Sequence, residues 1–83
     1  MKIYDYNHSQ KVPVIASFSA DGKIIPLYVQ VTSGDERINL SVRVLSFEDH
    51  TGIIFEYLCE YEHNNRTKRM NLYYNIKEHT WTL

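Results

Sequence analysis

The stretch NNRTKRMNLYY, residues 64–74, combines cations with aromatic side chains and is the segment best suited to binding a charged ligand. Phosphate groups would bind the cations Arg66, Lys68 and Arg69, and a base would stack on the Tyr73 ring. Small β-barrels bind single-stranded nucleic acid in this way. The same stretch also fits a β-hairpin in which Arg69 lies opposite Glu60. The negative charge of Glu60 then cancels much of the electrostatic field of Arg69. We therefore expect a hairpin corner, with nucleic-acid binding as the alternative function.

Histidine and cysteine are the residues that would indicate a metal site. Zinc sites usually show two pairs of ligands a few residues apart, whereas this chain has one isolated Cys59-x3-His63 step. Strand alternation points Cys59 inward while His63 lies at a turn, so the two do not meet. We expect no metal and no cofactor, a buried thiol, and solvated imidazoles at the four histidines, His8, His50, His63 and His79.

Catalytic signatures are also missing from the sequence. No serine or threonine lies in a glycine-flanked nucleophile turn, and the glycines form no phosphate-binding loop. Glu56, Glu60 and Glu62 share one strand face, where an acid/base pair is conceivable, but cationic neighbours favour a solvated surface. The prediction is that the protein is not an enzyme.

Length and composition indicate a small folded protein. The 83 residues are 43% hydrophobic with a net charge of −1, which is less basic than a general polyanion binder. Cys59 is the only cysteine, and the N-terminus does not resemble a secretory segment or a membrane-spanning helix. A cytoplasmic location and no membrane association are therefore expected.

Apolar residues recur at every second position from Val12 onward, which predicts half-buried antiparallel strands. Asp21-Gly22, Gly34-Asp35 and Asn64-Asn65 are strong hairpin turns, Lys77-Glu78 is a further turn, and Glu48-Asp49 is a weaker one. The turns predict registers that set Val14 opposite Val29, Ala16 opposite Leu27, Phe18 opposite Ile25, Val29 opposite Leu40, Val42 opposite Phe55, Tyr57 opposite Leu72, and Tyr74 opposite Trp81.

The fold class predicted from these registers is all-β, with a single small antiparallel meander of about six strands. Such a sheet must curl into a barrel-like (SH3-like) domain, pack as a sandwich, or pair with a second copy, and bends at Pro26, Gly52 and between Val44 and Phe47 favour curling. Residues 1–11 form a flexible or edge segment and residues 12–83 the single domain, with strands near 12–20, 23–32, 37–46, 53–62, 67–75 and 79–83. The predicted core is Val14, Ala16, Phe18, Leu27, Val29, Leu40, Val42, Phe55, Tyr57, Leu72, Tyr74 and Trp81.

Three segments carry a resemblance: DGKIIPLYVQV (residues 21–31), RINL after a short polar turn (37–40), and the terminal TWTL (80–83). In these strand and turn patterns the chain resembles small stand-alone all-β proteins of unknown function from Firmicutes, some encoded near mobile elements. The resemblance implies an all-β fold in a bacterial cytoplasm, and it implies no catalytic residue.

The outer face of the sheet carries the predicted function. The registers place Ile15, Tyr28, Ser41, Glu56 and Tyr73 in one row across five strands. Tyrosine and arginine are enriched at protein interfaces, so we expect a protein-interaction module that binds an unknown protein or a second copy of itself. The predicted partner-binding residues are Ile15, Tyr28, Arg43, Ile54, Leu58 and Tyr73.

Overall fold

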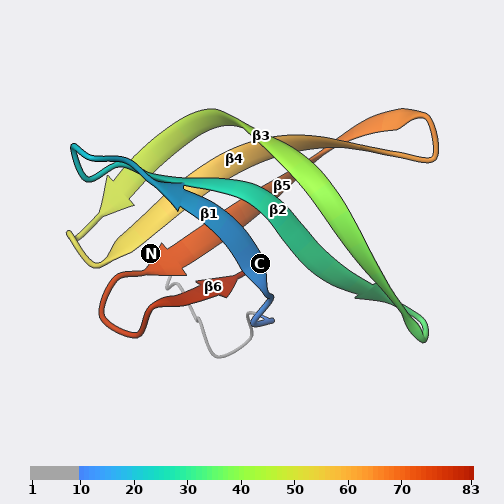
Figure 1. Cartoon of the computed structure of the whole chain (residues 1–83), viewed down its shortest axis with the longest axis horizontal. Coiled ribbons are helices and arrows are strands. Elements are labelled where there is room, and N and C mark those ends of the chain that lie inside the picture. The colour runs from blue at the N-terminus through green and yellow to red at the C-terminus, as the bar shows by residue number, and fades with distance from the viewer. Residues whose placement is uncertain (1–9) are drawn as a thin grey trace, which may run out of the picture.

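A computed structural model describes residues 10–83 and shows six antiparallel strands in one curled sheet, in the order of the sequence (Figure 1). The strands are β1 (Val14–Phe18), β2 (Ile24–Ser33), β3 (Glu36–His50), β4 (Ile54–His63), β5 (Arg66–Asn75) and β6 (Thr80–Thr82). This confirms the predicted all-β meander with a barrel-like curl. None of the described residues forms a helix that is long and apolar enough to cross a membrane.

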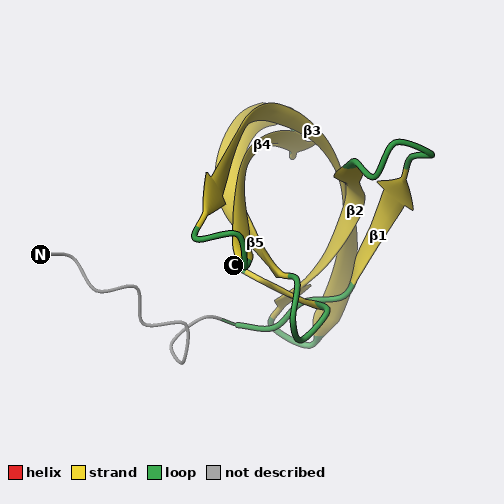
Figure 2. Cartoon of the chain, turned by 90° about the vertical axis from the view of Figure 1, so that its left-hand side faces the viewer, coloured by secondary structure: helices red, strands yellow, loops and turns green. Residues whose placement is uncertain are grey.

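The two ends of the sheet meet at residues 10–13 (Figure 2). The Val12 amide donates to the Trp81 carbonyl at 3.0 Å, and the Leu83 amide donates to the Gln10 carbonyl at 3.0 Å. Pro13 then accepts a hydrogen bond from the Gln30 amide, which brings the chain into β1 beside β2. The sheet is thus closed at one end by a segment that contacts both β6 and β2. Residues 1–9 of the predicted N-terminal segment lie outside the described part.

Most predicted registers are confirmed. Val14 pairs with Val29, Val29 with Leu40, Tyr57 with Leu72, and Tyr74 with Trp81. Asn64 and Asn65 both have positive φ, as a primed hairpin turn requires and as asparagine tolerates.

The β3–β4 register is the main error. The turn lies at residues 51–53 rather than at Glu48-Asp49, so Val42 pairs with Tyr61 instead of Phe55. The β3 strand is consequently 15 residues long, with residues 36–41 paired to β2 and residues 42–50 paired to β4. Because β3 changes partner, the β2–β3 and β4–β5 hairpins extend as two diverging arms (Figure 1).

Two β-bulges bend the sheet, and each adds one residue to a strand. Leu27 is extra in β2, so Ala16 pairs with Pro26 and Phe18 with Ile24 rather than with Leu27 and Ile25. Leu45 is extra in β3, where the register shifts between Val44 and Ser46. Both lie where bends were expected, next to Pro26 and between Val44 and Phe47. Each bulge reverses which face the following side chains occupy.

The interior is filled by large side chains. Tyr74 and Trp81 rings lie 4.6 Å apart between centroids, and Tyr57 lies 5.6 Å from Trp81. The Tyr57 hydroxyl donates to the Ile24 carbonyl at 2.6 Å and joins β4 to β2 across the interior. The buried core is Val12, Val29, Leu40, Val42, Ile54, Tyr57, Cys59, Leu72, Tyr74 and Trp81.

The predicted core residues are buried or partly buried, except for two residues of the β1–β2 hairpin, Phe18 and Leu27. Phe18 is 65% exposed and Leu27 is 39% exposed. Leu27 is displaced outward by its bulge, and Phe18 lies beside the open end of the sheet. Val14, Ala16 and Phe55 are partly buried against the core, and Cys59 is fully buried as expected.

Truncation to alanine should cost much more stability at the buried Leu72 than at Phe18, which was predicted to be buried but is exposed. Leu72→Ala removes a side chain with no exposed surface and should lower the free energy of unfolding by about 2–5 kcal/mol. Phe18→Ala should lower it by less than about 1 kcal/mol, because little packing is lost. Urea denaturation measures both, and equal losses would contradict the assigned faces.

Burial also makes the interior sensitive to high pH. It raises the pKa of the Tyr57 hydroxyl from 10.0 to about 12, with Tyr74 and Cys59 adding to the shift, and the pKa of the Cys59 thiol from 9.0 to about 11. The unfolded chain therefore loses these protons first, so the free energy of unfolding should fall as pH rises between about 9 and 12.

Cys59→Ala provides the control for this prediction. The stability difference between wild type and this variant should be constant below about pH 9 and should shrink between about pH 9 and 11. Urea titrations across that range measure it. A difference that does not change with pH would contradict the buried, protonated thiol.

Candidate functional site

The predicted outer row is divided in two. Ile15 pairs with Tyr28 and Tyr28 with Ser41, as expected. The next residue across, however, is not Glu56, because Glu56 lies opposite Glu48 in β3. The shifted β3–β4 register therefore separates the β1–β2 part of the row from Glu56 and Tyr73, which pair with each other.

The β1–β2 part of the row is an exposed apolar surface, here named the β1–β2 patch and made of Ile15, Ile25, Leu27 and Tyr28. Ile15 is 64% exposed and Tyr28 is 47% exposed. Strand alternation directs Ile15, Ile25 and Tyr28 outward, and the bulge sends Leu27 to the same side. A shallow hollow of about 470 Å³ lies beside Ile15 and Tyr28, lined also by Pro13, Val14, Gln30 and Asn39.

The edge of β1 next to this patch is unpaired in the part of the chain that the structure describes. Gln10 and Val12 form backbone hydrogen bonds with Leu83 and Trp81. Because β6 begins only at Thr80, it does not reach alongside β1, whose residues pair with β2 alone. Pro13 and Ser19 bond toward β2, so alternation along an antiparallel strand turns the amides and carbonyls of the even-numbered residues the other way. These are Val14, Ala16 and Phe18.

The other predicted partner-binding residues lie away from the patch, on β3, β4 and β5. Arg43 forms an ion pair with Glu60. Ile54 pairs with His50 on the outer face of the sheet, but it is only 9% exposed, so little of its side chain is accessible to a partner. Leu58 is half-buried between Ser46 and Asn71, and the Tyr73 hydroxyl donates to Glu56 at 3.3 Å.

The basic run forms part of the β4–β5 arm. Arg66, Lys68 and Arg69 are all exposed. Arg69 lies opposite Glu60, as the register predicted, and Glu60 also forms the ion pair with Arg43. The arm therefore carries both signs of charge rather than a uniformly basic surface.

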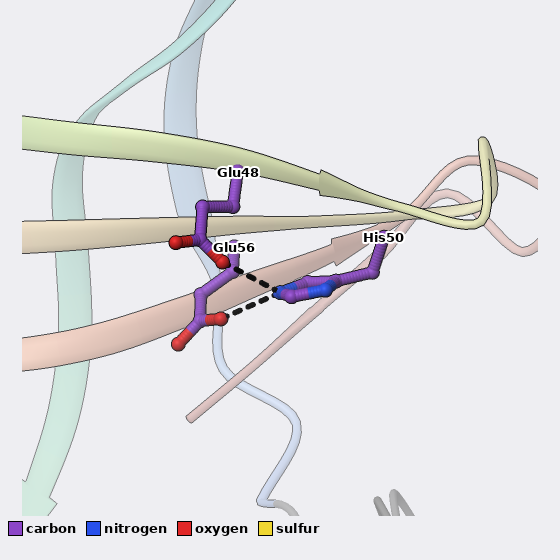
Figure 3. Close-up of side chains that lie close together, drawn as sticks. All are labelled: Glu48, His50 and Glu56. Carbon is purple, nitrogen blue, oxygen red and sulfur yellow. Dashed lines mark hydrogen bonds and ion pairs between the residues drawn. The ribbon is translucent and has the colours of Figure 1, made fainter.

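Three metal-ligand side chains converge on the outer face of β3 and β4, here named the Glu48–His50–Glu56 cluster. The His50 Nε2 atom lies 2.7 Å from Glu56 Oε1 and 3.5 Å from Glu48 Oε2. Figure 3 shows both carboxylates directed at the imidazole. His50 and Glu56 side chains are 26% and 20% exposed, whereas Glu48 is 71% exposed.

The Leu45 bulge is what brings these residues together. Val42 and Val44 point inward, so uninterrupted alternation would also point residues 46, 48 and 50 inward. The extra residue reverses the phase, so Phe47 faces the inner side, 5.2 Å from Tyr57 between ring centroids although 49% exposed, and Glu48 and His50 face outward. They meet Glu56 because Glu48 and Glu56 are directly paired.

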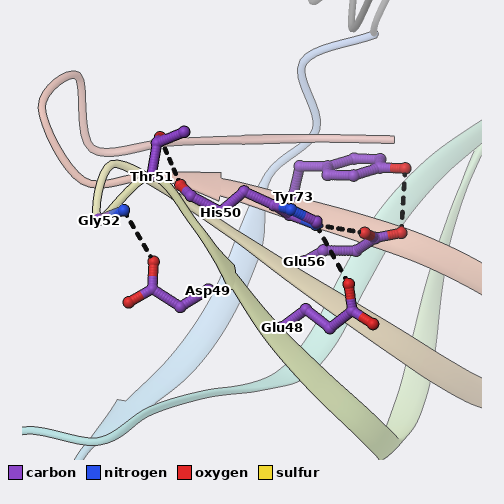
Figure 4. Close-up of polar contacts among 7 residues, drawn as sticks. All are labelled: Glu48, Asp49, His50, Thr51, Gly52, Glu56 and Tyr73. Carbon is purple, nitrogen blue, oxygen red and sulfur yellow. Dashed lines mark hydrogen bonds and ion pairs between the residues drawn. The ribbon is translucent and has the colours of Figure 1, made fainter. Parts of the chain in front are cut away.

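The turn after His50 fixes the end of the cluster (Figure 4). Thr51 and Gly52 both have positive φ, an unfavourable conformation for the β-branched Thr51. The Ile53 amide donates to the His50 carbonyl at 3.3 Å, and the Gly52 amide donates to Asp49 Oδ1 at 3.0 Å. These bonds hold His50 at the last position of β3.

This cluster was not predicted from the sequence, because the turn was expected at Glu48-Asp49. That turn would put Glu48 in a loop and move His50 away from Glu56. Gly52 was the available signal, since a glycine suits the left-handed turn that the structure places there.

The chain matches no known protein-family model, no curated protein and no solved structure. The resemblance to small all-β proteins from Firmicutes therefore stays a prediction.

Neutralising the basic run tests the nucleic-acid alternative. Replacing Arg66, Lys68 and Arg69 by Gln should leave the protein folded and cost at most about 1 kcal/mol per lost cross-strand pair. We expect neither wild type nor variant to bind a single-stranded oligonucleotide at physiological salt, measured by fluorescence anisotropy. Micromolar binding by wild type that the triple variant loses would favour the nucleic-acid function instead.

Proposed function

We propose that the protein is a protein-interaction module that takes up an extended segment of another polypeptide as an additional strand beside β1. The observation that carries the proposal is the one-sided pairing of β1 next to the exposed β1–β2 patch. An added strand would obtain main-chain hydrogen bonds from the edge and apolar contacts from the patch, which is how β-augmentation combines affinity with specificity.

The composition of β1 supports this function. Edge strands usually carry charged residues or proline, which prevent pairing with another chain. The sequence of β1 is VIASF, with no charge and no proline. Its edge is thus open to pairing at Val14, Ala16 and Phe18, whose backbone groups point away from β2.

The patch indicates the chemistry of the partner segment. Ile15, Leu27 and Tyr28 present aliphatic and aromatic surface, and the hollow beside Tyr28 is lined mainly by apolar atoms. A matching segment would alternate apolar and polar residues, so that one set of side chains meets the patch and the other faces solvent. Tyrosine at such a surface commonly contributes a large share of the binding energy.

A protein-interaction module of this kind would act in the cytoplasm and catalyse no reaction. We place the protein in the cytoplasm, where the free thiol of Cys59 would remain reduced. We assign no reaction to it, as the sequence predicts.

A proline in the edge strand tests strand addition directly. Ala16→Pro removes an amide that points away from β2, so the fold should be retained while pairing with an added strand is blocked. Linear peptides selected from a random display library against wild type should bind Ala16→Pro about tenfold more weakly or worse, and Ala16→Ser, which keeps the amide, should bind normally. Amide exchange should become slower at Val14, Ala16 and Phe18 when the peptide binds.

The same variants decide the identity of the partner. A concentration-dependent dimer in analytical ultracentrifugation that Ala16→Pro converts to monomer would identify the partner segment as β1 of a second copy. Equal peptide affinity for wild type and a folded Ala16→Pro would contradict the proposed function.

A further inference from the structure

We propose that the Glu48–His50–Glu56 cluster binds a divalent transition-metal ion of the zinc class, on a surface separate from the β1–β2 patch. The ligand set is one imidazole nitrogen and two carboxylate oxygens, a combination that zinc and its neighbours accept. All three donor atoms already lie within 4.8 Å of one another.

The spacing of the donor atoms fits a shared ion. Nitrogen and oxygen ligands at zinc distances in a tetrahedral site lie roughly 3.3 Å apart from one another. The His50 nitrogen is 2.7 Å from one carboxylate and 3.5 Å from the other, on either side of that value. The two carboxylate donors are at most 4.8 Å apart, and Glu48, at 71% exposure, is on the solvent side of the cluster, where its side chain has room to adjust.

The charge of the cluster also favours a cation. The two carboxylates carry like charges on directly paired residues, an arrangement that destabilises a sheet unless something neutralises it. The His50 Nε2 atom holds at most one hydrogen, which two carboxylates must share. A divalent ion at the same place would contact all three groups and balance both negative charges.

The backbone positions the donors before any ion binds. The Leu45 bulge and the turn at residues 51–53 fix His50 and Glu48 on the face of Glu56. The Tyr73 hydroxyl bonds Glu56 Oε2, leaving Oε1 directed at His50 (Figure 4). Outer hydrogen bonds of this kind orient metal ligands and raise affinity. The spacing of histidine and cysteine along the sequence predicted no metal, but such spacing does not detect carboxylates that a bulge brings beside His50.

Isothermal titration of the purified full chain with zinc chloride tests the site. Wild type should take up one zinc per chain with micromolar or tighter affinity, and Glu48→Gln, Glu56→Gln and His50→Gln should each weaken binding about tenfold or more. His63→Gln, which removes an imidazole on the β4–β5 arm, is the matched control and should bind zinc as wild type does. Magnesium should give no comparable heat, because it prefers oxygen ligands and its own water.

Cobalt adds a readout that does not depend on affinity. Co²⁺ in place of zinc should give visible absorption of a four- or five-coordinate ion in wild type, and the spectrum should be lost in a folded Glu56→Gln variant. Circular dichroism confirms folding of each variant. Absence of zinc uptake by wild type, or undiminished uptake by folded His50→Gln and Glu56→Gln, would overturn the proposal and leave the cluster as a hydrogen-bonded ion pair.

Discussion

The extra residue Leu45 in β3 determines which side chains of residues 46–50 face the interior of the sheet. Before it, Val42 and Val44 point inward, and after it Phe47 does. Without the bulge, Glu48 and His50 would lie on the inner face of the sheet, on the opposite side from Glu56. The change of partner from β2 to β4 comes earlier, between Ser41 and Val42. The polar cluster and the position of Phe47 thus both depend on one β-bulge.

Closure of the sheet imposes the second constraint. Residues 10–13 pair with the C-terminal strand on one side and with β2 on the other, but β6 is only three residues long. Past the end of β6, β1 is therefore paired only with β2 among residues 10–83. A sheet of this size hides its apolar face by curling, yet the short last strand leaves an edge that full closure would have removed. The edge of β1 is open because β6 begins at Thr80 and is too short to extend along β1.

The sequence predicted those parts of the fold where turn chemistry and alternation agree. Asn64 and Asn65 predicted the β4–β5 register correctly, and Gly34-Asp35 predicted the β2–β3 register correctly. A bulge leaves no comparable signal, because Leu27 and Leu45 are ordinary strand residues whose displacement depends on tertiary packing. Phe18 was therefore assigned to the core, and the β3–β4 pairing was shifted. The polar cluster was missed for the same reason, since it exists only in the bulged register.

Aromatic side chains at the centre of the sheet limit where a ligand can bind. Tyr57, Tyr74 and Trp81 fill the middle, as side chains do in small barrels. The outer face, the edges and an apolar hollow of about 400 Å³ beside Phe47 and Phe55 are accessible. The β1 edge and the polar cluster satisfy this condition with no residue in common, one on β1 and β2 and the other on β3 and β4. Substitutions at sites that share no interaction partner normally have additive energetic effects, so a change at one surface should leave the other intact.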